Sequence, residues 1–304
     1  MEYILTAENL SKNYRKHQVL NSLSMKVSKG CIYGFVGRNG AGKTTLMRII
    51  SGLQEPTSGE YTLFGVKNSD SSIQRTRKKV GAIVETPAIY KNVTAEENLR
   101  EQYIILGLPT FEGINQILQL VGLDKTGNKK VEDFSLGMRQ RLGIAVALCG
   151  NPELLILDEP VNGLDPQGII EIRELILKLN KEKKITFLIS SHILDELAKI
   201  ATHYGFINNG QIIKEISASE LEQIGGKCTR IEVSNADVLC AVLDTYRVVY
   251  KKLDERIIEV YGEININKLM IDLTQHDCQV LSINTSEESL ESYFMELVGG
   301  TENA

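Results

Sequence analysis

The stretch CIYGFVGRNGAGKTTLMRIISGL, residues 31–53, decides the fold of this chain. An almost wholly apolar run at residues 31–37 leads into GRNGAGKT at residues 37–44, and a helical pattern follows. The pattern G-x-x-x-x-G-K-[ST] between a strand and a helix is typical of a phosphate-binding P-loop. Its glycines let backbone N–H groups and the helix N-terminus point at negative charge.

The P-loop predicts two specific contacts with ATP. Lys43 is expected to hold the β- and γ-phosphates, and the Thr44 hydroxyl is expected to ligate Mg²⁺. The residues expected to bind the nucleotide here are Gly37, Asn39, Gly40, Ala41, Gly42, Lys43, Thr44 and Thr45. The alternative is a chance glycine-rich turn, against which the next motifs argue.

A second motif, LLILDEP at residues 154–160, ends a run typical of a buried strand. Asp158 then lies at the carboxyl end of that strand, where it can reach the metal's water shell. Glu159 points elsewhere because side chains alternate along a strand. It is the candidate that orients and deprotonates the attacking water, a role worth ~10²–10⁴-fold in rate. The alternative is two acids that simply end a strand.

The segment FSLGMRQR at residues 134–141 precedes this strand and occupies the place of the LSGGQ signature of the ABC ATPase family, which the chain resembles. The resemblance implies that Ser135 and Gly137 bind the γ-phosphate held by an opposite subunit, with Ser135 also capping the following helix. Leu136 and Met138 depart from the common pattern, but similar S-L-G-M versions occur in antibiotic-export subfamilies. Taken alone, the segment also fits an ordinary N-capped helix.

Three more segments extend the resemblance over about residues 1–225. NGLDP at residues 162–166 resembles the D-loop, which makes Asp165 a nucleotide-site candidate. His192 resembles the switch histidine and is expected near the γ-phosphate. Tyr14 resembles the aromatic residue whose flat ring stacks on adenine. A structural histidine and an exposed strand tyrosine are the alternatives.

Glu85 is the most informative departure from the family pattern. ABC ATPases usually have a glutamine between the sheet and the helical insertion, where it ligates Mg²⁺ and senses the transmembrane partner. The glutamate resembles that of lantibiotic-immunity and bacitracin-resistance transporters. A carboxylate can also ligate Mg²⁺, since hard cations favour oxygen ligands, but it adds negative charge beside phosphates. Neutral drift from glutamine is the alternative.

The expected fold class is α/β, a P-loop NTPase cassette of the ABC type with a RecA-like core, an antiparallel β-subdomain and a helical subdomain. Runs at residues 31–37, 154–158 and 185–190 are apolar throughout, which predicts a parallel sheet covered on both faces. Alternating runs at residues 3–10, 19–29 and 60–64 predict antiparallel strands. Residues 94–122 have helical spacing, with Gly107 and Gly122 as helix ends, and Asp165 is expected to cap a helix that begins at Pro166.

We place a domain boundary at Gly225-Gly226, giving a cassette over residues 1–225 and an accessory domain over 226–304. The second part has the order strand, helix, hairpin, helix, strand, helix, which predicts a small α+β domain, ferredoxin-like among the options. Its last helix has an apolar stripe formed by Leu290, Tyr293, Phe294, Leu297 and Val298.

The composition of the chain argues against several classes of partner and of metal site. With 304 residues, two unequal units are expected, and the net charge of −5 argues against binding to nucleic acid. The five cysteines form no C-x-x-C pair, so neither a disulfide framework nor a zinc site is expected. Neither a signal peptide nor a membrane-spanning run is apparent, so any membrane role is expected to go through a partner.

The hypothesis is therefore an ATP-hydrolysing subunit that sandwiches ATP in a homodimer and, at the cytoplasmic face of the membrane, powers a separate transmembrane permease. Export of a peptide antibiotic or bacteriocin rests on the family resemblance. The rival is a soluble ABC ATPase acting on ribosomes or nucleic acid, but members of that kind carry two cassettes or a long coiled coil. A regulatory module that does not hydrolyse ATP is a third alternative, against which Glu159 and His192 argue.

Overall fold

The computed structural model describes residues 2–224, 227–261, 264–276, 278–287, 290, 293–295 and 297–298. The chain forms two compact units, Met1–Ala218 and Ser219–Ala304. Gly225 and Gly226, where the sequence predicts the boundary, lie outside the described residues, as do several positions of the predicted last helix.

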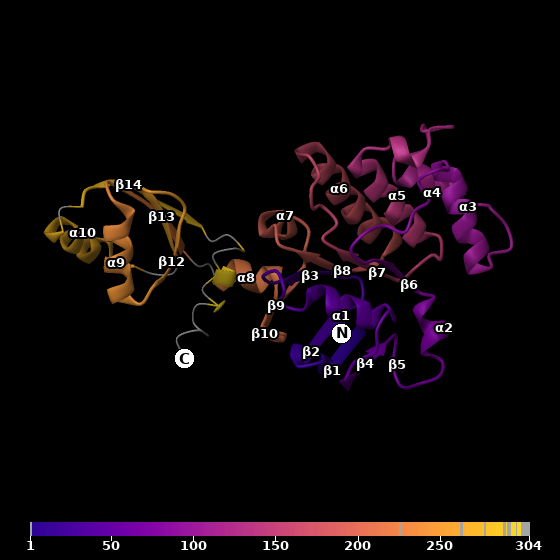
Figure 1. Ribbon diagram of the computed structural model, residues 1–304, viewed down its shortest axis with the longest axis horizontal. Helices are drawn as coiled ribbons and strands as arrows, with labels where there is room; N and C mark the ends of the chain where they lie inside the picture. The colour runs from indigo at the N-terminus through magenta and orange to yellow at the C-terminus, as the bar shows by residue number, and fades with distance from the viewer. Residues whose placement is uncertain are drawn as a thin grey trace. The chain divides into compact units, whose positions relative to one another are not determined.

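A six-stranded sheet forms the centre of the first unit (Figure 1). Its order is β10-β9-β3-β8-β7-β6, and its neighbouring strands are parallel except for β10 and β9. The strands are β3 (Ile32–Val36), β6 (Val80–Ile83), β7 (Leu154–Asp158), β8 (Thr186–Ser191), β9 (His203–Asn208) and β10 (Gln211–Ser217). Every residue of β3, β7 and β8 is buried. The predicted parallel sheet, covered on both faces, is confirmed.

Helices lie on both faces of this sheet. Figure 1 shows α5, α6 and α7 on one side and α1 with a second sheet on the other. The helices are α1 (Lys43–Ile50), α5 (Leu136–Leu148), α6 (Pro166–Lys183) and α7 (Leu194–Ala198). As predicted, the Asp165 side chain caps α6 by accepting from Gly168 N at 3.1 Å, with Pro166 in the first turn. One apolar core joins α1 to both sheets.

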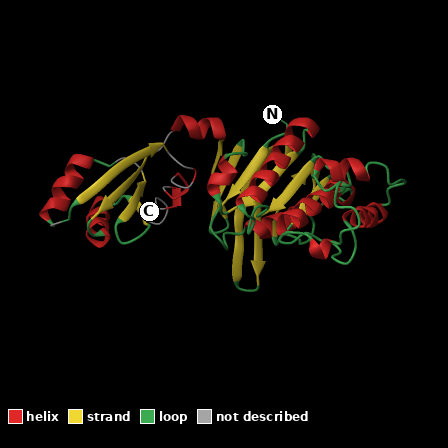
Figure 2. Cartoon of the chain, turned by 90° about the horizontal axis from the view of Figure 1, so that it is seen from above, coloured by secondary structure: helices red, strands yellow, loops and turns green. Residues whose placement is uncertain are grey.

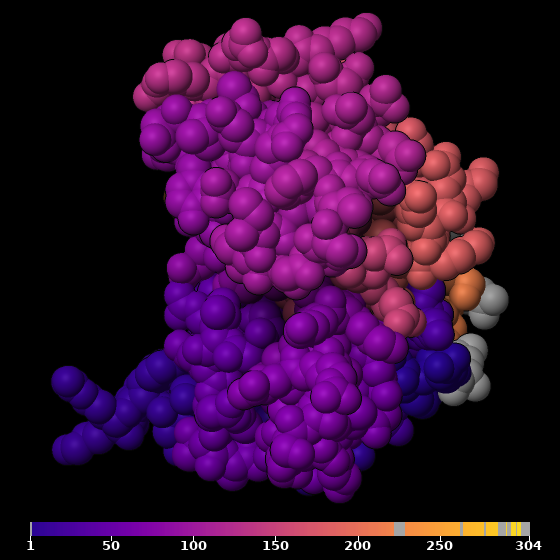
Figure 3. All heavy atoms as spheres, turned by 90° about the vertical axis from the view of Figure 1, so that its right-hand side faces the viewer, coloured from indigo at the N-terminus to yellow at the C-terminus, as the bar shows by residue number. Residues whose placement is uncertain are grey.

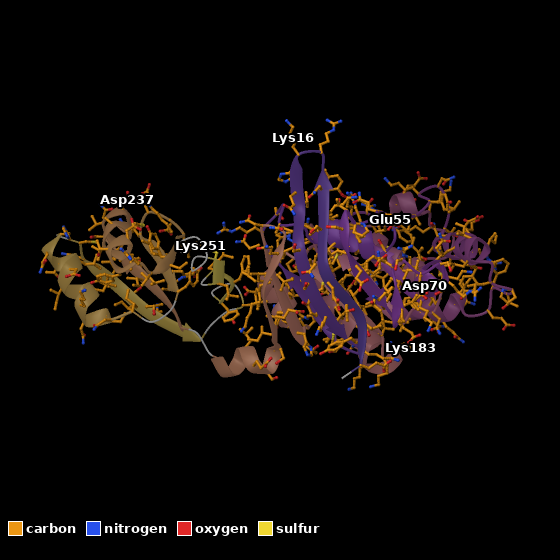
Figure 4. The ribbon with its side chains drawn as sticks, turned by 90° about the horizontal axis from the view of Figure 1, so that it is seen from below. Lys16, Glu55, Asp70, Lys183, Asp237 and Lys251 are labelled. Atoms are coloured by element: carbon orange, nitrogen blue, oxygen red, sulfur yellow. The ribbon has the colours of Figure 1, made fainter. Side chains whose placement is uncertain are left out.

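The second sheet is antiparallel, with the order β2-β1-β4-β5. Its strands are β1 (Tyr3–Tyr14), β2 (His17–Ser28), β4 (Ser58–Leu63) and β5 (Val66–Lys67). The predicted end of the first strand at residue 10 is wrong, because pairing with β2 continues to Tyr14 and His17. Lys16 therefore lies at the tip of a hairpin that projects from the surface (Figures 3 and 4).

The predicted helical insertion is confirmed and packs beside α5. Its elements are α3 (Ala95–Leu106), α4 (Ile114–Leu120) and the 3₁₀ turn Val131–Asp133, and a short helix α2 (Ile73–Arg77) precedes it. Thr94 and Glu97 form a capping box at the start of α3. Gly107 ends α3 with φ +66°, a left-handed conformation that suits glycine.

The second unit contains a four-stranded antiparallel sheet with the order β12-β13-β11-β14. Figure 2 shows its strands in yellow and its helices in red. Its elements are α8 (Ala218–Ile224), β11 (Lys227–Val233), α9 (Ala236–Tyr246), β12 (Val249–Lys252), β13 (Ile257–Tyr261), α10 (Ile266–Gln275) and β14 (Val280–Glu287). From β11 to β14 this is the β-α-β-β-α-β order of ferredoxin-like domains. Residues from the sheet and both long helices form its core, among them Ile231, Leu239, Val260 and Leu269.

No helix in the described parts of either unit has both the length and the apolar character needed to cross a bilayer.

The separate cores of the two units generate a prediction about truncation. A chain that ends at Gly226 should fold and bind ATP with unchanged affinity, because the residues around the P-loop pack within the first unit. Thermal melting and an ATP titration of the truncated chain check this expectation. An insoluble product, with the full chain soluble under the same conditions, would show that the two parts depend on one another.

Candidate nucleotide-binding site

The P-loop connects the end of β3 to the start of α1, as the sequence predicts. Gly42 caps α1 with φ +110°, and a Cβ there would lie 2.7 Å from Leu20 Cδ2 and 2.9 Å from Val19 O. Only glycine fits this position without displacing β2. Of the other predicted positions, Gly37, Ala41 and Thr45 are buried, whereas Asn39 and Gly40 are exposed.

Lys43 is the first residue of α1, and its side chain is only 6% exposed. Its ammonium donates to Gly37 O at 2.6 Å and to Arg38 O at 3.3 Å, and it lies 3.7 Å from Glu159 Oε1. Burial lowers the pKa of Lys43, while the charges of Glu159 and Asp158 oppose that shift. The ammonium is thus held inside the loop, where the phosphates of a nucleotide would be cradled.

Asp158 links three elements through its buried carboxylate at the end of β7. Thr44 Oγ1 donates to its Oδ2 at 2.8 Å, and Ser190 Oγ donates to its Oδ1 at 2.6 Å. Asp158 is 4% exposed, so both bonds replace water that the carboxylate would otherwise bind. These contacts place the end of β7 and the end of β8 against the start of α1.

Glu159 has φ +50°, which is rare for a residue with a side chain. Its backbone N–H donates to Ser190 Oγ at 2.9 Å. Its Oε2 lies 2.6 Å from His192 Nδ1 and accepts from His192 N at 3.2 Å, while Oε1 faces Lys43. The carboxylate therefore lies between the lysine of the P-loop and the predicted switch histidine.

Ser135 caps α5, and its Oγ accepts from Met138 N at 3.2 Å, as the resemblance implies. Gly137 is in the first turn of α5, where an added Cβ would meet nothing closer than 3.9 Å, at Gly168 and Leu164. Packing within the chain therefore does not require glycine there, although glycine costs a helix ~1 kcal/mol relative to alanine.

Tyr14 is the last residue of β1 and is 39% exposed. Its hydroxyl donates to Gln54 Oε1, and the Lys12 ammonium lies 5.4 Å from the centre of its ring. The ring is therefore partly exposed at the surface, beside the projecting hairpin tip.

Glu85 follows β6 with φ +68° and is 57% exposed. Its carboxylate forms an ion pair with Arg48 of α1. The contacts found among the described residues thus join Glu85 to the P-loop helix through Arg48, a partner that no sequence motif indicates.

Five of the predicted residues come together as one group at the ends of β7 and β8 and the start of α1. They are Lys43, Thr44, Asp158, Glu159 and His192. Ser135, Gly137 and Asp165 form a second group at the starts of α5 and α6. The sequence motifs do not identify two residues that contact predicted site residues. Ser190 could be recognised from its position near the end of a strand, two residues before His192. Arg48 has no feature in the surrounding sequence that would identify it.

The chain is similar to known proteins in both sequence and structure. The family model described as ABC transporter matches residues 20–162. The bacitracin transport ATP-binding protein BcrA of Enterococcus faecalis is 41% identical over 99% of this chain and 98% of its own length. The lantibiotic transport ATP-binding protein SrtF of Streptococcus pyogenes is 45% identical over 73% of this chain and 95% of its own.

Among solved structures, the dimeric bacterial ABC transporter cassette MJ0796 is similar, with a TM-score of 0.64 and 25% identity over 70% of this chain and 98% of that one. The similarity thus includes the cassette in both sequence and fold, and with BcrA it extends over nearly the whole chain. The chain therefore belongs to the ABC transporter ATP-binding proteins and is an ATP-hydrolysing cassette.

Proposed function

We propose that Lys43 and the P-loop bind the phosphates of ATP, that Glu159 activates the attacking water, and that a homodimer of this chain powers a separate permease that expels a peptide antibiotic. The observation that carries the proposal is the position of the Glu159 carboxylate between Lys43 and His192. Lys43 holds the phosphates, so a base next to it faces the γ-phosphate. A general base must first lie within hydrogen-bond distance of the proton that it removes, and its pKa is relevant only then.

His192 is the positioning partner of that base. Its ring nitrogen and backbone N–H both contact Glu159 Oε2, which fixes the direction of the carboxylate. When ATP enters, its phosphate oxygens replace Gly37 O and Arg38 O as partners of the Lys43 ammonium. Glu159 Oε1 is then released to accept a proton from water while Oε2 stays bound to His192.

The residues present also fit Mg²⁺. Thr44 Oγ1 and Asp158 Oδ2 are hydroxyl and carboxylate oxygens only 2.8 Å apart, and such oxygens are the ligands that Mg²⁺ prefers. These two residues would hold the ion, directly or through its water. Bound Mg²⁺ neutralises charge on the β- and γ-phosphates. Glu85, which pairs with Arg48 of α1, is a third proposed oxygen ligand.

A second copy of the chain completes the site. The group around Ser135 and Gly137 lies at the start of α5 and is not among the partners of Lys43 in the chain's own P-loop. Gly137 leaves room for a phosphate to approach the backbone N–H groups that begin the helix. The dimeric MJ0796 cassette supports this arrangement. Because each copy carries both groups, a homodimer has two complete sites, with Asp165 beside each.

The substrate and the membrane partner are inferred from the relatives. BcrA is named for bacitracin transport and SrtF for lantibiotic transport, and BcrA covers nearly the whole chain. Both names concern peptide antibiotics, which supports expulsion of such a peptide over an action on ribosomes or nucleic acid. The permease would be another chain, and it would hold this subunit at the cytoplasmic face of the membrane.

The substitution Glu159→Gln tests the proposed base. ATP should still bind, while hydrolysis should slow by ~10²-fold or more because the water loses its base. Steady-state ATPase rates and size measurements in ATP are the readouts, and the variant should accumulate as an ATP-bound dimer. Cells that express it with the permease should lose resistance to the peptide antibiotic. Turnover near that of the wild type, with monomers only, would contradict both the base and the sandwich.

Ser190→Ala tests whether Ser190 positions the two acids. The Ser190 hydroxyl donates to Asp158 and accepts from the Glu159 N–H, so its removal should lower the free energy of unfolding by ~1–3 kcal/mol. It should also slow hydrolysis, since the Asp158 carboxylate and the Glu159 backbone N–H lose their common partner. Denaturant unfolding and ATPase rates measure the two effects. Ser191→Ala is the matched control, because the Ser191 hydroxyl contacts only the nearby Ile193 backbone among the contacts found. Equal rates for the two variants would contradict the role.

A further inference from the structure

Arg173 of α6 and Glu196 of α7 form an ion pair that joins the two helices. Arg173 Nη1 donates to Glu196 Oε2 at 3.0 Å. Both side chains are mostly covered, the arginine being 23% exposed and the glutamate 20%. The pair borders a small cavity of about 20 Å³ whose apolar lining includes Ile176, Leu197 and Ile200. Water therefore screens this pair less than it screens ion pairs at the open surface.

Glu196 has a second cationic partner close to it in sequence. The Lys199 ammonium, one turn further along the chain, lies 2.5 Å from Glu196 Oε1. The hydrogen bond from Lys199, together with the charges of Lys199 and Arg173, lowers the pKa of Glu196 although burial opposes the shift, so the carboxylate stays ionised. The bond from Arg173 joins α7 to another helix, whereas the bond from Lys199 is local.

The helix α7 depends on tertiary contacts for its position because it is short. It has five residues, and Ile193 at its N-cap is an apolar residue whose side chain cannot accept a hydrogen bond. One side of α7 packs on the central sheet, where a Cβ at Gly34 of β3 would lie 2.7 Å from Leu197 Cδ2. In contrast, α6 has 18 residues and a row of buried positions. Arg173 thus extends from a well-anchored helix to a short one.

The position of α7 matters because of the residues that precede it. β8 ends at Ser191 and α7 begins at Leu194, so His192 lies in a link of two residues. His192 contacts Glu159 Oε2 with both its ring nitrogen and its backbone N–H. With so short a link, a shift of α7 would move the His192 backbone and, with it, the partner that directs the Glu159 carboxylate.

We propose that Arg173 is a positioning residue for ATP hydrolysis: through Glu196 it holds α7 against α6, and so keeps His192 in place beside Glu159. The inference rests on the proposed function, since it takes Glu159 as the base and His192 as its partner. Because Arg173 acts through other residues, its loss affects the rate of hydrolysis and leaves the binding of ATP intact.

The experiment measures two quantities on the full chain. ATP affinity is measured by calorimetry with chelator and no added Mg²⁺, and the hydrolysis rate is measured at saturating ATP with Mg²⁺. The test variants are Arg173→Gln, Arg173→Lys and Glu196→Gln. Lys199→Gln is the matched control, because it removes a cation from the same glutamate but leaves the link between the helices. Melting temperatures establish that each variant is folded.

Arg173→Gln should slow hydrolysis by about fivefold to fiftyfold, because a misplaced base loses part of its rate advantage. Its ATP affinity should stay within about twofold of the wild type, since the contacts of Lys43 come from the P-loop, away from α7. Arg173→Lys should hydrolyse ATP faster than Arg173→Gln, because the charge remains. Lys199→Gln should hydrolyse ATP at the wild-type rate.

Two further measurements separate positioning from a general loss of structure. If Arg173 acts through His192, adding Arg173→Gln to His192→Ala should slow hydrolysis by less than about twofold in single-turnover assays. The chain has four histidines, so the His192 ring can be observed by nitrogen NMR and assigned with His192→Ala. Its signals should move in Arg173→Gln and stay in place in Lys199→Gln.

A hydrolysis rate of Arg173→Gln equal to that of Lys199→Gln would overturn the proposal. An unchanged His192 signal in Arg173→Gln would do the same, as would the full Arg173→Gln defect in the His192→Ala background, because Arg173 would then act without His192. If Arg173→Gln does not fold, Glu196→Gln decides, and a wild-type rate in that variant counts against the proposal. Failure of the proposed function looks different: Glu159→Gln would then hydrolyse ATP at the wild-type rate, whatever the result for Arg173.

Discussion

The buried carboxylate of Asp158 must be hydrogen-bonded, because an ionised group removed from water is costly without partners. Its two partners, Thr44 and Ser190, come from α1 and from β8. Satisfying this one group therefore brings together the P-loop helix and the carboxyl ends of two parallel strands. Glu159 follows directly, and its N–H shares the Ser190 hydroxyl. The cradle for ATP is organised around this requirement.

The same arrangement underlies the proposed dimer. In the proposed site, the group around Lys43 supplies a cation, a base and metal-binding oxygens from the start of α1 and the ends of β7 and β8. The group around Ser135 lies on the helical segment and presents Gly137, a glycine that the chain's own packing does not demand. Charge on the γ-phosphate would draw the two groups together across a dimer. In the proposed function, closure and opening of the dimer would be the mechanical signal passed to the permease.

Much of the site could be predicted from sequence, because its residues lie in local motifs at the ends of strands. Lys43 and Asp158 could be recognised because each lies in a motif at the end of an apolar run that is typical of a buried strand. Ser190 could have been found by asking which hydroxyl would satisfy a carboxylate at the next strand end. Arg48 could not, since its pairing with Glu85 depends on how a loop turns toward an exposed helix face. The extension of β1 to Tyr14 likewise depends on its pairing with β2.

An equilibrium titration with ATP shows whether the P-loop around Lys43 is where this chain binds the nucleotide. Each contact of the Lys43 ammonium with a phosphate is worth ~1.5–3 kcal/mol. ATP should bind saturably to the full chain, and Lys43→Ala should lose tight binding while still folded. Undiminished affinity in a folded Lys43→Ala variant would contradict it.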